Sequence, residues 1–301
     1  MPELPDVEIY CESLQRFYGG RRVETISIRS PFVVRTFDPD ISTIEGRRIV
    51  GFSRLGKRIV WEFEDELFLI LHLMIAGRLH RKPPGKLPRS KTDLAAFVFG
   101  EADGPADVLM LTEASPKKRA SVHLVEGRTA LAVHDPQGIE PLDCTLEEFA
   151  ARLRSENHTL KRSLASQRLF SGIGNAYSDE ILHAARLSPI MLTSKLSDEE
   201  AARLHAAMQA TLRAWTERVR AEAGDGFPEK VTAFHPAMAV HGKYGQPCPD
   251  CSAPVQRIRY ADNETNYCAR CQTGGKVLAD RSLSRLLKED WPRTIEEWEA
   301  K

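Results

Sequence analysis

The first residues of the chain carry the groups needed for nucleophilic catalysis at a carbon of the aldehyde oxidation level. The chain begins Met1-Pro2-Glu3-Leu4-Pro5, and removal of Met1 would leave Pro2 with a free secondary amine. An α-amino group titrates near about 7.7–8.0, so a neutral, nucleophilic fraction exists at neutral pH. Its attack on such a carbon forms an iminium, which acidifies the neighbouring C–H and permits elimination. Since Glu3 can donate or accept the proton, we predict Pro2 as nucleophile and Glu3 as acid and base.

The same residues also have a purely structural interpretation. Pro5 suits the first turn of a helix, and acidic side chains such as Asp6 are favourable near a helix N-terminus. These residues alone favour the structural interpretation, and the other motifs of the chain reverse that preference.

Two C-x-x-C pairs near the C-terminus predict a zinc site. Sixteen residues separate the pairs, which are formed by Cys248, Cys251, Cys268 and Cys271. This spacing is typical of a four-cysteine zinc ribbon, with a β-hairpin between the pairs. Four thiolates leave no position for water, so we predict one structural Zn²⁺ per chain and no catalytic metal. The absence of a thioredoxin-like βαβ pattern around the pairs argues against redox chemistry, and metal-binding cysteines favour a reducing, cytoplasmic compartment.

A Gly-Ile-Gly-Asn sequence at residues 172–175 lies between two helical patterns. Gly174 would expose backbone N–H groups to an anion, and Asn175, expected as a helix N-cap, would add an amide side chain. DNA phosphate is such an anion, although most Gly-x-Gly sequences between helices are only turns. Arg257 and Arg259 in the ribbon could also bind phosphates or be solvated charges.

Lys57 follows Gly56 in a tight connection between two predicted strands. A lysine beside a glycine can approach a phosphate closely. An ordinary solvated turn lysine is the alternative, and the local sequence favours neither.

The surrounding elements indicate an α+β protein of several domains. An N-terminal helix, whose apolar residues recur from Val7 to Phe17 and which stops at Gly19, precedes many short strands that suggest a β-sandwich. The predicted strands are Val23–Ile28, Arg48–Ser53, Ile59–Phe63, Leu67–Leu73, Ala95–Phe99, Val108–Leu111, Ser121–Val125 and Thr129–Val133. We expect a β-sandwich domain at 1–140, a helical domain at 146–235, a zinc ribbon at 240–273 and a tail at 274–301.

Three further segments have weaker interpretations. Residues 82–91 are rich in proline and lysine and predict a mobile loop. The stretch 100–127, with basic residues at 117–119, is expected to be an extra hairpin or a basic contact. In the tail, four leucines between 278 and 287 suggest one short helix before Trp291.

The composition of the chain excludes some classes of function. The 301 residues include 42 basic and 42 acidic ones, which argues against a protein that coats nucleic acid non-specifically. No apolar run reaches the ~18 residues of a membrane span, and the N-terminus lacks the basic region of a signal peptide. We therefore expect a soluble protein with no membrane partner.

The order of these motifs resembles the formamidopyrimidine-DNA glycosylase/endonuclease VIII family. The resemblance rests on Pro2-Glu3-Leu4-Pro5, Gly-Ile-Gly-Asn and the cysteine ribbon, and spans roughly residues 2–272. It implies a helix–two-turn–helix DNA glycosylase, expected as a monomer, that removes oxidised bases from double-stranded DNA and cleaves abasic sites. By analogy, Pro2 attacks C1′, Glu3 is the general acid, and Lys57 and Asn175 bind phosphates.

The departures from the family pattern concern the reading of the lesion. Asp6 stands where the family usually has glutamate, and Ile75 occupies the usual methionine position of the segment that wedges into DNA. Gln137 and Ile139 follow Asp-Pro where the family has two arginines and a phenylalanine. Asn263 replaces an arginine at the hairpin tip, so Arg257 or Arg259 would have to bind phosphate instead.

Two other functions stay open at this point. The missing arginines and the neutral charge also suit a non-catalytic, damage-sensing DNA-binding protein on the same scaffold. A ribosome-type RNA-binding protein would leave Pro2 and Glu3 unexplained. The sequence does not identify the lesion, the opposite base or the type of elimination.

Overall fold

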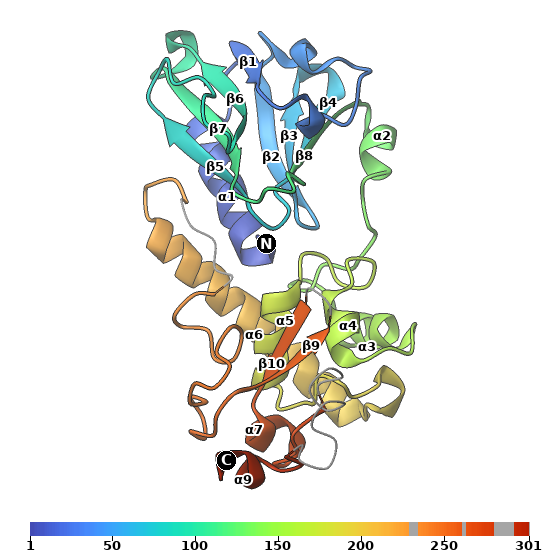
Figure 1. Cartoon of the computed structure of the whole chain (residues 1–301). Coiled ribbons are helices and arrows are strands. Elements are labelled where there is room, and N and C mark those ends of the chain that lie inside the picture. Colours follow the sequence, from blue (N-terminus) through green and yellow to red (C-terminus); the bar gives the residue numbers. More distant parts are fainter. Residues whose placement is uncertain (229–233, 261–262, 280–291, 301) are drawn as a thin grey trace. The chain divides into compact units, whose positions relative to one another are not determined.

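The computed structural model describes residues 1–228, 234–260, 263–279 and 292–300 of the chain (Figure 1). The chain divides into two compact units. The first comprises Met1–Pro136 and Thr216–Thr232, and the second comprises Gln137–Trp215 and Ala233–Lys301.

The first unit is a sandwich of two antiparallel four-stranded sheets with one long helix (Figure 1). One sheet has the strand order β1-β6-β7-β5 and the other β2-β3-β4-β8. The strands are β1 (Thr25–Ile28), β2 (Ile49–Leu55), β3 (Arg58–Phe63), β4 (Leu67–His72), β5 (Gly77–Lys82), β6 (Asp93–Phe99), β7 (Asp107–Glu113) and β8 (Ser121–Glu126). Short 3₁₀ turns are η1 (Pro31–Val33), η2 (Ile41–Ile44), η3 (Glu64–Glu66) and η4 (Glu101–Asp103).

An apolar core fills the space between the sheets. Alternation along β3 turns Ile59, Trp61 and Phe63 to this core, where all three are fully buried. Trp61 meets Phe97 of the opposite sheet with ring centroids 4.7 Å apart. The predicted sandwich is therefore confirmed.

Helix α1 (Leu4–Tyr18) packs on this sandwich. Its buried face includes Val7 and Leu14, as the helical periodicity predicts. Tyr18 stacks on Phe99 of β6 with ring centroids 4.2 Å apart, and the helix ends at Gly19. The amino terminus is thus attached to a rigid element.

Two local predictions for this unit were wrong. The segment Thr129–Val133, predicted as a strand, forms the helix α2 (Arg128–Ala132) instead. Gly127, with φ +84°, turns the chain out of β8, and the following Ala/Leu/Arg residues are good helix formers. Strand β5 was missed because its alternating residues are arginine, histidine and lysine, not apolar residues.

The stretch 100–127 is not an inserted hairpin. It contains β7, which lies between β6 and β5 in one sheet, and β8, which pairs with β4 in the other. The connection between β7 and β8 therefore crosses from one sheet to the other, and the basic residues at 117–119 lie in that crossing.

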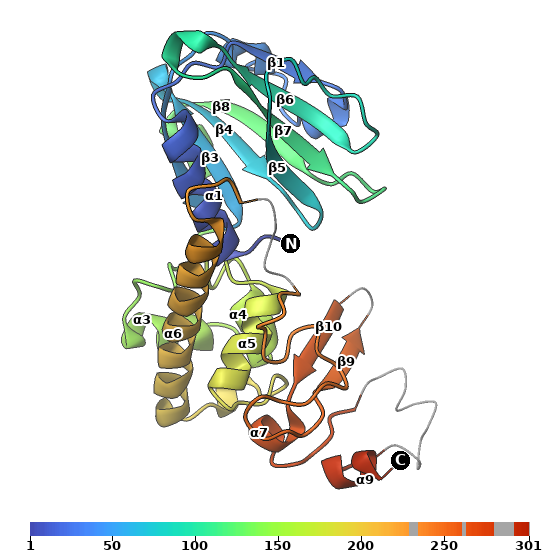
Figure 2. The same cartoon turned by 90° about the vertical axis from the view of Figure 1, so that its left-hand side faces the viewer.

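The second unit combines helices with a two-stranded ribbon (Figure 2). Its helices are α3 (Leu146–Arg154), α4 (Leu160–Ala165), α5 (Asn175–Ala184), η5 (Thr193–Lys195), α6 (Asp198–Ala223), α7 (Ala269–Thr273) and α9 (Ile295–Glu299). The residues of α6 from Thr216 onward are grouped with the first unit. Strands β9 (Gln256–Tyr260) and β10 (Asn263–Tyr267) form the predicted hairpin, which lies beside α5.

The remaining predictions for this region concern the tail and the membrane. The helix expected from the leucines between 278 and 287 falls outside the described residues. Among the helices that are described, none is both long enough and apolar enough to span a bilayer.

Candidate active site and metal centre

In the first unit, the predicted catalytic residues lie at the start of α1. Glu3 is the N-cap residue and Pro5 lies in the first helical turn, so these residues do start a helix, as the structural interpretation predicts. The backbone N–H of Glu3 donates to Oδ2 of Asp6 at 2.9 Å, and both side chains are only 3% exposed. Asp6 therefore fixes the position of Glu3, a role that the sequence did not suggest.

Four charged side chains lie within electrostatic reach of the amino terminus. Burial lowers the pKa of the Met1 amino group below its ordinary value, while Glu3 opposes the shift. Arg78 lowers this pKa further, Asp6 raises it, and Lys57 lowers it. A lowered pKa increases the neutral, nucleophilic fraction of the amine at pH 7. The structure thus brings Glu3, Asp6 and Lys57 together around the amino end of the chain.

Lys57 sits in the two-residue turn between β2 and β3, where Leu55 pairs with Arg58. Gly56 has φ +62°, which a glycine adopts without strain. Arg54 supports this turn, because its Nη1 donates to the carbonyl of Gly56 at 3.2 Å and its Nε donates to Glu8 Oε2 at 3.1 Å. Neither Arg54 nor Glu8 was predicted, since only the fold brings the turn against α1.

A group of histidines lies close to this turn. Burial lowers the pKa of His72 to about 4, and the charges of Arg58 and Lys57 act in the same direction. His123, whose pKa is also lowered to about 4, stacks near His134 with ring centroids 4.8 Å apart. These imidazoles are neutral hydrogen-bonding groups at pH 7. They come from segments far apart in the sequence, so no local motif predicted the group.

The predicted wedge residues are divided between the two units. Ile75 belongs to the first unit, in the turn between β4 and β5, and is 56% exposed. Gly77 must be glycine there, since a Cβ would lie 2.2 Å from the carbonyl oxygen of Leu73. An exposed apolar side chain on a tight turn has the form that a wedge requires.

Gln137 and Ile139 belong to the second unit. The N–H of Ile139 donates to the carbonyl of Leu169 at 3.1 Å, and the carbonyl of Ile139 accepts from Ser171 N–H at 2.9 Å. Gln137 has φ +61°, a left-handed conformation that is uncommon outside glycine. The segment is thus fixed to the helical unit by these hydrogen bonds.

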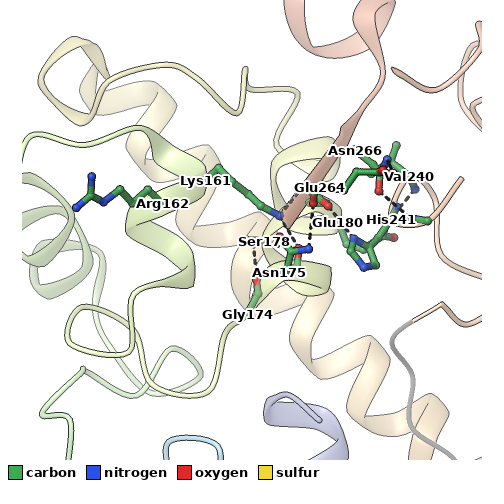
Figure 3. A network of polar contacts seen from close by, with 12 residues as sticks. Lys161, Arg162, Gly174, Asn175, Ser178, Glu180, Val240, His241, Glu264 and Asn266 are labelled. Carbon is green, nitrogen blue, oxygen red and sulfur yellow. Dashed lines mark hydrogen bonds and ion pairs between the residues drawn. The ribbon is translucent and has the colours of Figure 1, made fainter. Parts of the chain in front are cut away.

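In the second unit, the Gly-Ile-Gly-Asn sequence begins helix α5 (Figure 3). The N-cap residue is Gly174, so the prediction of Asn175 as the N-cap was wrong; Asn175 is the first helical residue. Its Nδ2 donates to the backbone carbonyl of Glu264 in β10 at 3.0 Å. Because an amide carries two N–H donors, Asn175 can hold the ribbon and still bind a phosphate.

Buried polar contacts attach the ribbon segment to α5 (Figure 3). Oε1 and Oε2 of Glu180 accept the backbone N–H groups of Ala239, Val240 and His241 at 2.7–2.9 Å. Asp179 Oδ2 lies 2.7 Å from His241 Nδ1, and its Oδ1 lies 2.6 Å from Lys161 Nζ. A buried carboxylate is stable only with such partners, so the contacts specify one position for the ribbon on the helices.

The two ribbon arginines differ in their surroundings. The Arg257 guanidinium lies 4.1 Å from the ring centroid of Tyr244 and 3.5 Å from the Glu264 carboxylate. Arg259 is 61% exposed and lies 3.9 Å from the same carboxylate. Glu264 therefore partly offsets the positive charge of the hairpin, and Arg259 is the more accessible of the two arginines.

The four ribbon cysteines form the metal centre. Their Sγ atoms all lie within 4.8 Å of one another, with Cys251–Cys268 at 3.3 Å and Cys248–Cys271 at 3.9 Å. A tetrahedral ion with Zn–S bonds of about 2.3 Å would separate its sulfurs by about 3.8 Å. The cluster fits one structural Zn²⁺. His183 of α5, which the sequence did not indicate, places Nε2 3.3 Å from Cys248 Sγ.

Three family models match the chain in order. Residues 1–139 match the formamidopyrimidine-DNA glycosylase N-terminal domain, and residues 137–223 match the formamidopyrimidine-DNA glycosylase H2TH domain. Residues 245–274 match a zinc finger found in FPG and IleRS. The last match agrees with the cysteine cluster described above.

Similar proteins cover between half and nine tenths of the chain. A formamidopyrimidine-DNA glycosylase of Solibacter usitatus is 30% identical over 283 residues, which is 90% of this chain and 99% of the relative. An uncharacterized formamidopyrimidine-DNA glycosylase-like protein of Mycobacterium tuberculosis is 40% identical over 151 residues, 50% of this chain and 94% of the relative. The crystal structure of the Lactococcus lactis enzyme, non-covalently bound to DNA that contains an AP site, matches with a TM-score of 0.78 and 28% identity, over 90% of this chain and 99% of that one.

Proposed function

The chain belongs to the formamidopyrimidine-DNA glycosylase family, and we propose that it removes oxidised or ring-opened bases from double-stranded DNA and then cleaves the abasic strand. The observation that carries this proposal is the group of charged residues around the amino terminus. Burial lowers the pKa of the Met1 amino group at this position, and an amine beside Glu3 is what a Schiff-base mechanism needs of Pro2 once Met1 is removed. A protein that only bound DNA would have no use for it.

The first step joins the enzyme to the sugar. After removal of Met1, the Pro2 nitrogen attacks C1′ of the damaged nucleotide and the bond from C1′ to the base breaks. The base leaves with the electron pair of that bond and takes up the proton that the Pro2 nitrogen loses. Glu3 donates a proton to the sugar ring oxygen, so that the ring opens and an iminium forms between C1′ and Pro2. Asp6 holds the backbone of Glu3 in place for this transfer.

The second step cleaves the strand. The iminium acidifies the C2′ proton, and its removal expels the 3′ phosphate from C3′. Water then hydrolyses the iminium and restores the free amine of Pro2. Every bond change lies on the sugar, so the protein must supply one nucleophile, one acid–base group and firm positioning of the phosphates.

Lys57 and Asn175 are the residues that we assign to the phosphates. Lys57 is a cation on a supported turn near the amine, and Asn175 offers an amide N–H at the start of α5, where the helix dipole favours an anion. Arg259, the more exposed ribbon arginine, adds a further contact from the hairpin. The damaged nucleotide must leave the stack before Pro2 can reach its C1′. Leaving the stack costs a few kcal/mol, and this cost is lowest for damaged bases.

The substrate range follows from the wedge positions. Ile75 is an exposed apolar residue that can enter the stack, whereas Gln137 and Ile139 bring no charge to the opposite base. Without bidentate arginine contacts, discrimination among opposite bases is weak. We therefore propose activity on several oxidised or ring-opened bases, with little preference for the opposite base.

Borohydride trapping tests this function. The Met1-processed protein is incubated with duplex DNA that contains one abasic site, and the mixture is reduced. We expect a covalent complex that mass spectrometry maps to Pro2 and that a Pro2→Gly variant forms poorly. Mapping of the adduct to a lysine, or its absence with Met1 shown to be removed, would contradict the mechanism.

The second candidate is a damage-sensing protein that binds DNA without cleaving it. It is favoured by the pairing of Glu264 with both ribbon arginines and by the neutral residues Gln137 and Ile139. This protein would bind abasic-site DNA tightly and give no adduct, so the trapping experiment separates the two functions.

A further inference from the structure

The segment from β5 to the start of β6 concentrates positive charge in a chain that is neutral overall. Residues 78–93 include six lysines and arginines and a single acid, Asp93, whereas the whole chain has 42 residues of each sign. The basic residues are Arg78, Arg81, Lys82, Lys86, Arg89 and Lys91. The proposed mechanism uses none of them directly.

Strand alternation sorts these charges between two faces. Arg81 turns toward Asp107, with Nη2 2.7 Å from Oδ2, and its guanidinium lies 3.9 Å from the ring centroid of Phe17. Arg81 is therefore a structural residue on the α1 side of the sheet. Because side chains alternate along a strand, Arg78, His80 and Lys82 project from the opposite face.

These side chains line a groove of about 530 Å³ on the outer face of the sheet. Strand β5 is the edge strand of that sheet, as Figures 1 and 2 show, and the neighbouring β7 adds Met110 and Thr112 to the lining. The segment that follows β5 adds Lys86 and Arg89. The groove thus has an apolar part and several cations along its length.

Asp93, the single acid in the lining, makes hydrogen bonds within the groove wall. Oδ2 of Asp93 accepts the backbone N–H groups of Arg89 and Ser90 at 2.9 and 2.8 Å. This turn holds the segment that carries Arg89 against the start of β6. Four permanent cations, those of Arg78, Lys82, Lys86 and Arg89, therefore outnumber one carboxylate.

One end of the groove lies beside the amino terminus. Arg78 lines the groove and is also one of the charges that act on the Met1 amine. Its Nη1 donates to the carbonyl of Gly77 at 2.6 Å and to that of Ile75 at 3.3 Å, so it is attached to the wedge turn. A strand of DNA whose damaged nucleotide reaches Pro2 would pass close to this end.

We propose that this groove binds the phosphate backbone of the same DNA molecule, in the part that flanks the damaged nucleotide. The cations form a row along a strand and its following segment, which suits a chain of phosphates. A single small anion would instead be held by a compact nest of N–H groups. The proposal rests on the proposed function, because it takes the DNA at Pro2 as the occupant.

The salt dependence of DNA binding tests the proposal. The test variant is Lys82→Gln/Lys86→Gln/Arg89→Gln, at three exposed positions that leave Arg78 and the catalytic residues intact. The control is Arg22→Gln/Arg29→Gln/Arg47→Gln, which removes the same charge from the same unit outside the groove. The probes are a long and a short duplex with one central tetrahydrofuran abasic analogue, the short one ending a few base pairs from it.

We expect the test variant, but not the control, to bind the long duplex about tenfold more weakly at low salt. The slope of log K against log salt should fall by about 0.9 for each lost phosphate contact. The short duplex should bind both variants equally. Equal losses in the two variants, an unchanged test variant, or an equal loss with the short duplex would each overturn the proposal.

These outcomes are independent of catalysis, because the analogue cannot react with Pro2. If borohydride trapping fails while the difference in salt dependence persists, the proposed enzyme function fails and the groove still binds DNA. If trapping succeeds without that difference, only the groove inference fails.

Discussion

Arg54 Nε donates a hydrogen bond to Glu8 Oε2 at 3.1 Å, and this contact attaches the turn of Lys57 to the helix whose N-cap is Glu3. The Arg54 side chain is only 11% exposed, whereas that of Glu8 is 41% exposed, so the contact is shielded on the Arg54 side. We predict that Arg54→Gln lowers the rate of strand cleavage about tenfold, because small misplacements of a positioning group are costly. Single-turnover kinetics on abasic-site DNA measures the effect.

The Glu8→Gln variant is the matched control for the same contact. It should reproduce part of the loss of rate, because it removes the hydrogen bond to Arg54 Nε but leaves the one from Arg54 Nη1 to the Gly56 carbonyl. The double variant should lose little more than Arg54→Gln alone, because both changes remove the same contact between Arg54 and Glu8. The free energy of unfolding should fall by roughly 1 kcal/mol in each case. Independent, additive losses would show that Arg54 and Glu8 do not act through one another.

Replacement of Glu3 by glutamine separates the enzyme from the damage sensor. The hydrogen bond from Glu3 to Asp6 uses the backbone N–H of residue 3, so it survives in Glu3→Gln. We expect base removal and strand cleavage to fall by about 10²–10⁴-fold, the usual contribution of an acid–base group. Affinity for abasic-site DNA, measured by fluorescence anisotropy, should be retained. Unchanged cleavage would remove Glu3 from the mechanism.

The half-buried histidines His72 and His123 predict that stability falls in mild acid. Burial and the charges of Arg58 and Lys57 lower the pKa of His72 to about 4, and His123 behaves similarly beside His134, Arg58 and Arg35. In the unfolded chain these groups titrate near about 6.5. Protonation therefore favours the unfolded state, so the stabilisation present above about pH 6.5 is lost as the pH falls toward 4.

Urea unfolding at a series of pH values measures this loss. The wild-type midpoint should fall between pH 6.5 and 4.5, and His72→Gln/His123→Gln should flatten that dependence. His80→Gln, which changes a histidine in the groove, is the control and should follow the wild type. A double variant that is as acid-sensitive as the wild type would show that other groups govern the transition.

Patterns confined to a short stretch predicted the fold well. Helix α1 follows from residues spaced along one helical face, and the ribbon follows from four cysteines with fixed spacing, because each pattern needs only local geometry. The sequence did not predict strand β5, because the residues on its exposed face are basic. It predicted α2 as a strand, because the helix is short and partly apolar. Short segments carry too little periodicity to separate helix from strand.

Contacts between distant segments could not be predicted. Arg54 reaches Glu8 only because strand β2 packs against α1, and His72 lies near His123 only because β4 pairs with β8. Asp6 was interpreted as a lesion-reading residue by resemblance, yet its carboxylate holds the N–H of Glu3. Local sequence thus predicted the reactive groups, and the structure was needed to find the residues that we propose to position them.

The contact between His183 and Cys248 makes a prediction for the zinc site. Nε2 of His183 lies 3.3 Å from Cys248 Sγ, and the imidazole is 4% exposed, so it belongs to the environment of the thiolate. Outer contacts of this kind typically change metal affinity by about 10–100-fold. We expect His183→Phe to lose zinc to a competing chelator at least about tenfold more readily, while His183→Gln, which keeps an N–H donor, falls between it and the wild type.

Because the ribbon also contacts Asn175 through Glu264, zinc loss should weaken DNA binding in parallel. Equal zinc retention in all three proteins would show that His183 only fills space beside the ribbon.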